Sequence, residues 1–354
     1  MNETFGKISQ QHIFYSCATR RSGLNAREAY RFGRISEELA ERVGIDVWKC
    51  RVAVAVHGCI NIWIKPMEEC LVPLKTSYLL SLGNGDLEFS ILNSSLYVWN
   101  CFESLPITEI ENTIHGLFDR MTFLEGEKAL LGLNPFWQMC KNLIEPNRSN
   151  PVDIIGEVMT QEDLEDLRNM EDHYGYVRSI DPYRLILAYH FSDFETAETL
   201  LEGNSQLYMN VSTLGAAYFR MYDALVLLAG AKKGDWRRIR RVRRHLKIMR
   251  NWSRVCPENF LGKQYLVEAE LAALQNDAST ARSKYYLAII QSRDAGLLMQ
   301  EALANELAGK FYCSAGDQAK ATPFLKEACR LYKIWGGVAK LQHLEEEIRH
   351  LLIG

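Results

Sequence analysis

The residues with the clearest capacity for chemistry form a basic run from Lys232 to Arg254, KKGDWRRIRRVRRHLKIMRNWSR. The run holds eleven lysines and arginines but a single acid, Asp235, so its charge is about +10, whereas the whole chain carries −3. Apolar residues recur every three or four positions, which predicts a helix over residues 237–250 with one apolar side packed inward. The basic side is the candidate partner-binding site, formed by Arg237, Arg238, Arg240, Arg241, Arg243, Arg244, Lys247 and Arg250.

Three interpretations of this helix are open from the sequence. In the first, the arginine stems cover neighbouring repeats and pair with acids elsewhere in the chain, whose net charge outside this run is about −13. In the second, the helix binds an acidic protein partner or peptide on the surface of a repeat protein. In the third, the helix binds the phosphate groups of nucleic acid or of lipid headgroups, or binds a nuclear-import receptor. Only this third interpretation predicts a steep dependence of binding on salt concentration.

Other residues that could hold a metal or catalyse a reaction lack the required spacing. The eight histidines are dispersed, and His57 and Cys59 would point about 200° apart on a helix. The chain contains no GxxxxGK[ST] phosphate loop, no HRD or DFG kinase signature and no nucleotide-binding glycine boxes of a histidine kinase. We therefore expect no catalytic residue, no cofactor and no metal.

The elements that must position the basic helix follow from an internal repeat. An offset of 40 residues aligns Asp277 with Asp317 and superposes Ala281 on Ala321, Tyr285 on Leu325 and Ala288 on Ala328. Each aspartate is expected to cap the second helix of a hairpin, after a residue that tolerates positive φ. Pro323 departs from the pattern, so that helix either kinks or begins later.

Weaker copies of the turn occur upstream. Asp193, Asp235 and Asp277 are spaced by 42 residues, and Gly85-Asp86 is a further copy. The segment AREAYRFGRISEELAERVG predicts an amphipathic helix that ends at Gly44. Its expected apolar face consists of Ala29, Phe32, Ile35, Ser36, Leu39 and Val43.

These patterns predict an all-α fold, an α-solenoid of tetratricopeptide-like helical hairpins with a period of about 40–42 residues. Prolines concentrate at Pro135, Pro146, Pro151 and Pro182. We therefore expect N-terminal repeats over residues 1–133, an irregular connecting segment over 134–182 and C-terminal repeats over 183–354.

Composition fits a cytoplasmic protein that binds no membrane. The nine cysteines are scattered and never form a CxxC pair, which favours a reducing compartment over a disulfide framework. The first residues, MNETFGKISQQ, lack the apolar core of a signal peptide, and no apolar run is long enough to span a bilayer.

Three segments share packing motifs with a known class of proteins. They are GLNAREAYRFGRISEELAERV, QEALANELAGKFY followed by Leu331, Tyr332, Trp335 and Gly336, and the positions Trp63, Pro66, Leu71, Leu74, Ser77, Tyr78, Leu82, Gly85, Asp86, Glu88 and Phe89. The segments resemble the helical-repeat region of multidomain signalling proteins that combine AAA-type ATPase, protein-kinase and sensor histidine kinase domains. The resemblance implies a helical region that normally stands between catalytic domains.

The resulting expectation is a non-catalytic module for protein–protein interaction and regulation in signal transduction, with a protein or acidic peptide as its partner. Two alternatives stay open. The chain could be a regulator that binds nucleic acid or another anionic ligand through residues 237–250, or a fragment of a larger ATPase or sensor kinase.

Overall fold

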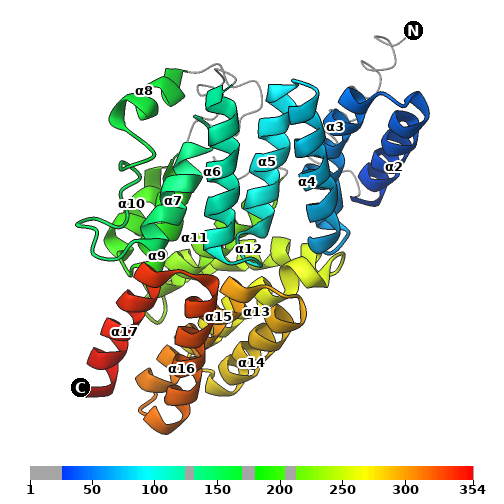
Figure 1. Ribbon diagram of the computed structural model, residues 1–354. Coiled ribbons are helices and arrows are strands. Elements are labelled where there is room, and N and C mark those ends of the chain that lie inside the picture. Colours follow the sequence, from blue (N-terminus) through cyan, green and yellow to red (C-terminus); the bar gives the residue numbers. More distant parts are fainter. Residues whose placement is uncertain (1–25, 124–130, 170–179, 204–212, 354) are drawn as a thin grey trace. The chain divides into compact units, whose positions relative to one another are not determined.

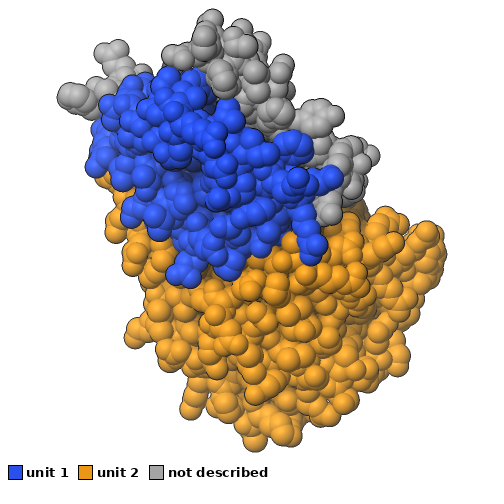
Figure 2. Space-filling model, turned by 90° about the vertical axis from the view of Figure 1, so that its right-hand side faces the viewer, with its two compact units in different colours: residues 1–101, 118–130, 209–216 blue, residues 102–117, 131–208, 217–354 orange. Residues whose placement is uncertain are grey.

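The computed structural model describes residues 26–123, 131–169, 180–203 and 213–353. Every regular element within these ranges is a helix, which confirms the predicted all-α fold class. The chain divides into two compact units, coloured separately in Figure 2. Unit 1 comprises residues 1–101, 118–130 and 209–216, and unit 2 comprises residues 102–117, 131–208 and 217–354.

Unit 1 is built from four helices that pack in chain order, each against the next. They are α2 (Ala26–Val43), α3 (Asp46–Ala55), α4 (Glu68–Gly83) and α5 (Leu87–Cys101), with a π-helical turn at Val56–Ile60 and a 3-10 turn at Asn61–Trp63 after α3. The Asn93 side chain ties α5 to α3 by donating to the carbonyl oxygen of Cys50 at 3.1 Å.

Helix α2 confirms the predicted helix and its stop at Gly44, where φ is +68°. The predicted buried face is wrong in part, because Phe32 is 38% exposed and Ile35 is 51% exposed. Ser36 is buried as predicted, and Gly33, which was not part of the predicted face, is buried as well. A Cβ atom at Gly33 would lie 3.5 Å from the side chain of Val56, which is ordinary van der Waals contact, so this side of α2 faces Val56.

Unit 2 contains most of α6 (Ile107–Phe123) and α11 (Gly215–Ala229), together with the helices from α7 onward. The others are α7 (Asn134–Ile144), α8 (Gln161–Asn169), α9 (Asp181–His190), α10 (Phe194–Gly203), α12 (Trp236–Ser253), α13 (Pro257–Leu274), α14 (Ala278–Asp294), α15 (Leu298–Ser314), α16 (Gln318–Trp335) and α17 (Val338–Ile353). From α12 to α17 each helix packs against the next, which is the arrangement of an α-solenoid (Figure 1).

The repeat turns have the structure that the sequence predicts. Asp235, Asp277 and Asp317 are the N-caps of α12, α14 and α16, and each accepts a hydrogen bond from the backbone N–H three residues later. Asp86 and Asp193 accept the same bond at α5 and α10. The residue before each aspartate has positive φ, namely Gly85, Ser192, Gly234, Asn276 and Gly316.

The small residues of the repeat lie where neighbouring helices meet. Ala281 and Ala321 are fully buried, as are Ala288 and Ala328. A Cβ atom added to Gly309 in α15 would lie 2.6 Å from the side chain of Leu325 in α16, so that glycine is needed for the close approach of the pair.

The prolines require two corrections. Helix α16 begins at Gln318, where the aspartate cap places it, and continues through Pro323, so of the two alternatives for this proline the later start is wrong. The segment 134–182, predicted to be irregular, contains α7 and α8. Pro135 and Pro182 stand in the first turns of α7 and α9, where a proline removes no helical hydrogen bond.

No helix in the described ranges is both long enough and apolar enough to cross a membrane.

Candidate functional site

The candidate partner-binding residues all lie on helix α12, which confirms the predicted basic helix. Asp235 caps the helix by accepting a hydrogen bond from the backbone N–H of Arg238 at 3.2 Å. Val242, Leu246 and Met249 are buried, so the expected apolar side faces the interior of unit 2. The basic side chains therefore project from the flanks and the outer face of the helix.

Three of the eight candidates pair with carboxylates of neighbouring helices. Arg238 forms two hydrogen bonds with Glu198 of α10, at 2.6 and 3.0 Å. Arg241 donates to Asp223 of α11 at 2.9 Å, and Arg250 donates to Glu268 of α13 at 3.0 Å. For these three residues the first interpretation holds, because they attach α12 to the solenoid.

The other five candidates are exposed: Arg237, Arg240, Arg243, Arg244 and Lys247. None of them forms a salt bridge with an acid in the part of the chain that the structure describes. Arg237 lies 5.5 Å from the ring centre of Trp236, and that indole is itself 62% exposed. The outer face of α12, defined as Trp236 with these five cations, therefore offers positive charge beside one aromatic ring.

Beneath the outer face, basic groups surround one carboxylate. Asp223 lies 3.3 Å from Nε2 of His245 and 2.9 Å from Arg241, and Arg220 contacts His245 at 3.0 Å. Burial alone would raise the pKa of Asp223, but His245 and Arg241 outweigh it and hold that pKa below its usual value. Asp223 therefore stays ionised and is already occupied by basic partners of its own unit.

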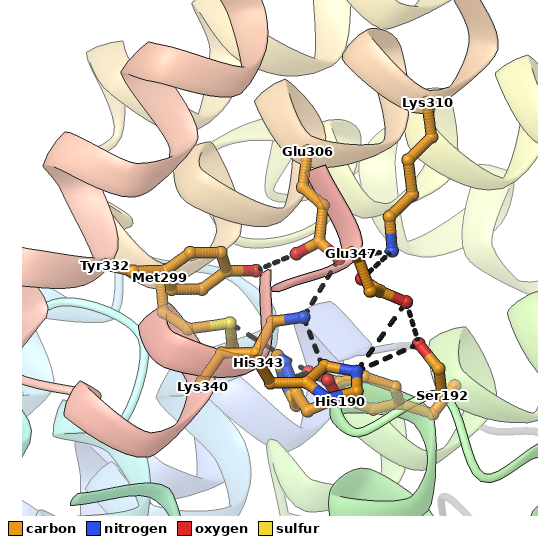
Figure 3. A network of polar contacts seen from close by, with 10 residues as sticks. His190, Ser192, Met299, Glu306, Lys310, Tyr332, Lys340, His343 and Glu347 are labelled. Atoms are coloured by element: carbon orange, nitrogen blue, oxygen red, sulfur yellow. Dashed lines mark hydrogen bonds and ion pairs between the residues drawn. The ribbon is translucent and has the colours of Figure 1, made fainter. Parts of the chain in front are cut away.

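A second candidate site is a polar network buried in unit 2, shown in Figure 3. Lys340 of α17 is almost fully buried and donates to the carbonyl oxygen of His190 at 2.8 Å and to Glu306 at 2.9 Å. Glu306 also accepts from Lys310 and from the hydroxyl of Tyr332, both at 2.8 Å. Burial opposes ionisation of Glu306, but the two ammonium groups lower its pKa to about 2.

The edge of this network brings a serine, a histidine and a carboxylate together. Ser192 donates to Glu347 at 2.6 Å, and Nε2 of His343 lies 3.4 Å from Ser192 and 3.6 Å from Glu347 (Figure 3). In a catalytic triad the histidine stands between the other two and uses opposite ring nitrogens. Here one nitrogen faces both groups and the serine donates directly to the carboxylate, which does not activate a nucleophile.

The positive φ of Ser192 also has a structural cause. Its φ of +59° matches the residue that precedes the capping aspartate in every repeat turn described above. The network is therefore best explained as a satisfied set of charges that fixes α17 to α9 and α15. No local sequence pattern predicts this network, because Lys340 and His190 are 150 residues apart.

The remaining chemical candidates are also explained by packing. His57 pairs with Glu37 at 2.9 Å, and Cys59 is buried. Among the described residues, no group of three or more histidine, cysteine, aspartate or glutamate side chains could hold a metal ion. All eight described cysteines are free thiols, and Cys17 lies outside the described residues.

No known protein-family model matches the chain, and no curated protein shows significant sequence similarity to it.

Proposed function

We propose that this protein is a non-catalytic helical-repeat module for protein–protein interaction and regulation, and that the outer face of α12 binds an acidic segment of a partner protein. One observation carries the proposal: five exposed cations lie on one helix without an acidic partner among the described residues. Like charges repel one another on an exposed helix face that has no acidic partner within the described part of the chain. An external anion would relieve this repulsion, which explains why the cations are there.

The behaviour of the paired arginines supports carboxylate as that anion. The same helix already binds Glu198, Asp223 and Glu268 through Arg238, Arg241 and Arg250. Arginine presents a planar fork that matches a carboxylate, so the four outward arginines can extend this chemistry to a partner, and Lys247 adds a further positive charge. A role in ATPase- or kinase-linked signal transduction and a cytoplasmic location belong to the same proposal, and the resemblance of the packing motifs supports the signalling role.

The test measures binding of a fluorescent acidic peptide, sixteen residues of glutamate and alanine, by anisotropy at low ionic strength. In the outer-face variant, Arg240, Arg243, Arg244 and Lys247 are all changed to Gln. We expect the peptide's Kd to rise at least about tenfold, since each charged contact at an interface contributes on the order of 0.5 kcal/mol or more.

The matched control removes four cations from α16, with Lys320, Lys326, Arg330 and Lys333 changed to Gln. These side chains are also exposed, so both variants have the same net charge. The control should bind the peptide like the unaltered protein. Equal loss in both variants, or no peptide binding at all, would refute the proposal, and tighter binding of oligo(dT) than of peptide would favour a nucleic-acid regulator.

A further inference from the structure

The cations of the outer face follow the turns of α12. From Trp236, residues Arg240, Arg243 and Lys247 follow at intervals of four, three and four residues, and Arg244 stands next to Arg243, so these side chains lie on one side of the helix. We call this row of side chains the stripe. At 1.5 Å per residue, the stripe extends for about 17 Å, or three helical turns. A ligand that neutralises it must present negative charges at nearly the same spacing.

This spacing favours a helix as the ligand. Acids placed three and four residues apart on a partner helix recur once per turn, about every 5.4 Å, and stay in register with the cations of α12. An extended chain presents side chains on one face about every 6.6 to 6.8 Å, so it loses register within the length of the stripe.

Trp236 gives the stripe a direction. Its indole stands at the first residue of α12 and is one of the most exposed large apolar side chains in the described part of the chain. Tryptophan and arginine are the residues that contribute most often to binding energy at protein interfaces. An apolar or aromatic side chain at one end of the ligand would cover the indole, while the acids lie along the cations.

The extent of the positive surface argues for a short ligand. The run from Lys232 to Arg254 carries about +10 and the rest of the chain has a net charge of about −13, so an excess of positive charge is concentrated in this run. A polyanion much longer than this run would also reach residues outside it, whose net charge is negative, whereas a helix of three or four turns would not.

We propose that the outer face of α12 binds an acidic amphipathic helix that carries an aromatic residue at one end, seated on Trp236. This inference rests on the proposed function and adds the conformation and the anchor of the partner segment. It is a docking surface for one class of ligand, and the spacing of the cations and the exposed indole are the two features that select it.

The test measures the affinity of the whole chain for three labelled peptides of equal charge. The first is a helical sixteen-residue peptide with glutamates at intervals of three and four residues and a terminal phenylalanine. The second replaces the phenylalanine by alanine, and the third keeps the composition of the first but has a central proline. We expect the first peptide to bind at least about tenfold more tightly than the other two, and Trp236→Ala to remove only the advantage that the phenylalanine gives.

The outcomes separate this inference from the proposed function. Equal affinity for the three peptides would overturn the helix and the anchor, while the charge-based function stands. If Trp236→Ala weakens all three peptides equally, the indole does not contact the phenylalanine and the anchor is wrong. If no peptide binds, both proposals are refuted. Circular dichroism of the Trp236→Ala variant checks that any loss of peptide affinity is not caused by unfolding.

Discussion

His190 shows how the interior of unit 2 controls the charge of one residue. Its Nε2 lies 2.8 Å from the hydroxyl of Tyr222, and the ring is buried. Burial and the nearby charges of Lys340, Lys310 and His343 lower the pKa of His190 to about 3, against the opposing effect of Glu306. The imidazole is therefore neutral in the folded protein at any pH well above 3.

This shift predicts a dependence of stability on pH. Between the ordinary value of 6.5 and about 3, the unfolded chain binds a proton at His190 that the folded protein does not bind. The free energy of unfolding should therefore be fully present above pH 6.5 and should fall on acidification, by up to about 1.4 kcal/mol per pH unit from this residue. Urea unfolding at pH 7, 6 and 5 measures the slope.

The control for that prediction is His190→Gln, which cannot titrate. The variant should lose less stability than the unaltered protein between pH 7 and 5, whatever its stability at pH 7. Glu306 adds its own loss only at lower pH, because its pKa of about 2 in the folded state lies below its ordinary value. Equal slopes for both proteins would show that His190 is not held neutral.

At the scale of the helical hairpin, the capping aspartate is the element that repeats. Five helices begin with the same bond from a backbone N–H to an aspartate carboxylate, and each follows a residue with positive φ. In the turn before α10 the N–H of Asp193 also reaches back to the carbonyl oxygen of Ala188 at 2.8 Å. One residue thus ends the first helix of a hairpin and starts the second.

Replacing this aspartate should cost the stability of a helix cap. Asp193→Ala removes the acceptor for the N–H of Thr196, which is bonded at 3.1 Å, and should reduce the free energy of unfolding by about 1 kcal/mol. Asp193→Asn keeps an oxygen in the same place and should lose much less. Urea denaturation of the two variants checks the difference, and equal losses would mean that the carboxylate acts through its charge rather than as a cap.

Such local signals explain which parts of the structure could be predicted. Each capping aspartate and the basic helix depend on residues close in sequence, so local patterns predict them. The spacing of 40 to 42 residues between Asp193, Asp235, Asp277 and Asp317 is also visible in the sequence. The buried pairs Lys340 with Glu306 and Lys263 with Glu103 join residues 34 and 160 positions apart, so no local pattern predicts them. The predicted apolar face of α2 is wrong at Phe32 and Ile35, because single apolar side chains are often exposed, and periodicity alone does not show which side of a helix faces its neighbour.

Across the whole molecule, charge is distributed unevenly at a low net value of −3. Helix α12 concentrates cations that its neighbours only partly neutralise, since Glu198, Asp223 and Glu268 each pair with one arginine on its flanks. The outer face keeps five pairs of like charges three or four residues apart, namely Arg237 with Arg240, Arg240 with Arg243, Arg240 with Arg244, Arg243 with Lys247 and Arg244 with Lys247. Each pair disfavours the folded helix by about 0.2–0.5 kcal/mol.

Removing these repulsions should stabilise the protein while it abolishes partner binding. Changing Arg240, Arg243, Arg244 and Lys247 to Gln should raise the free energy of unfolding by about 1–2 kcal/mol at low salt, and by less in 0.5 M NaCl, where exposed charges are screened. The α16 control should not gain stability, because Lys320 and Arg330 form salt bridges with Asp317 and Glu327. A residue set kept at a cost to folding is expected of a binding surface. If the α12 variant instead proves less stable than the unaltered protein in urea titrations, its outward cations serve the fold, and the first interpretation of the basic helix applies to all eight residues.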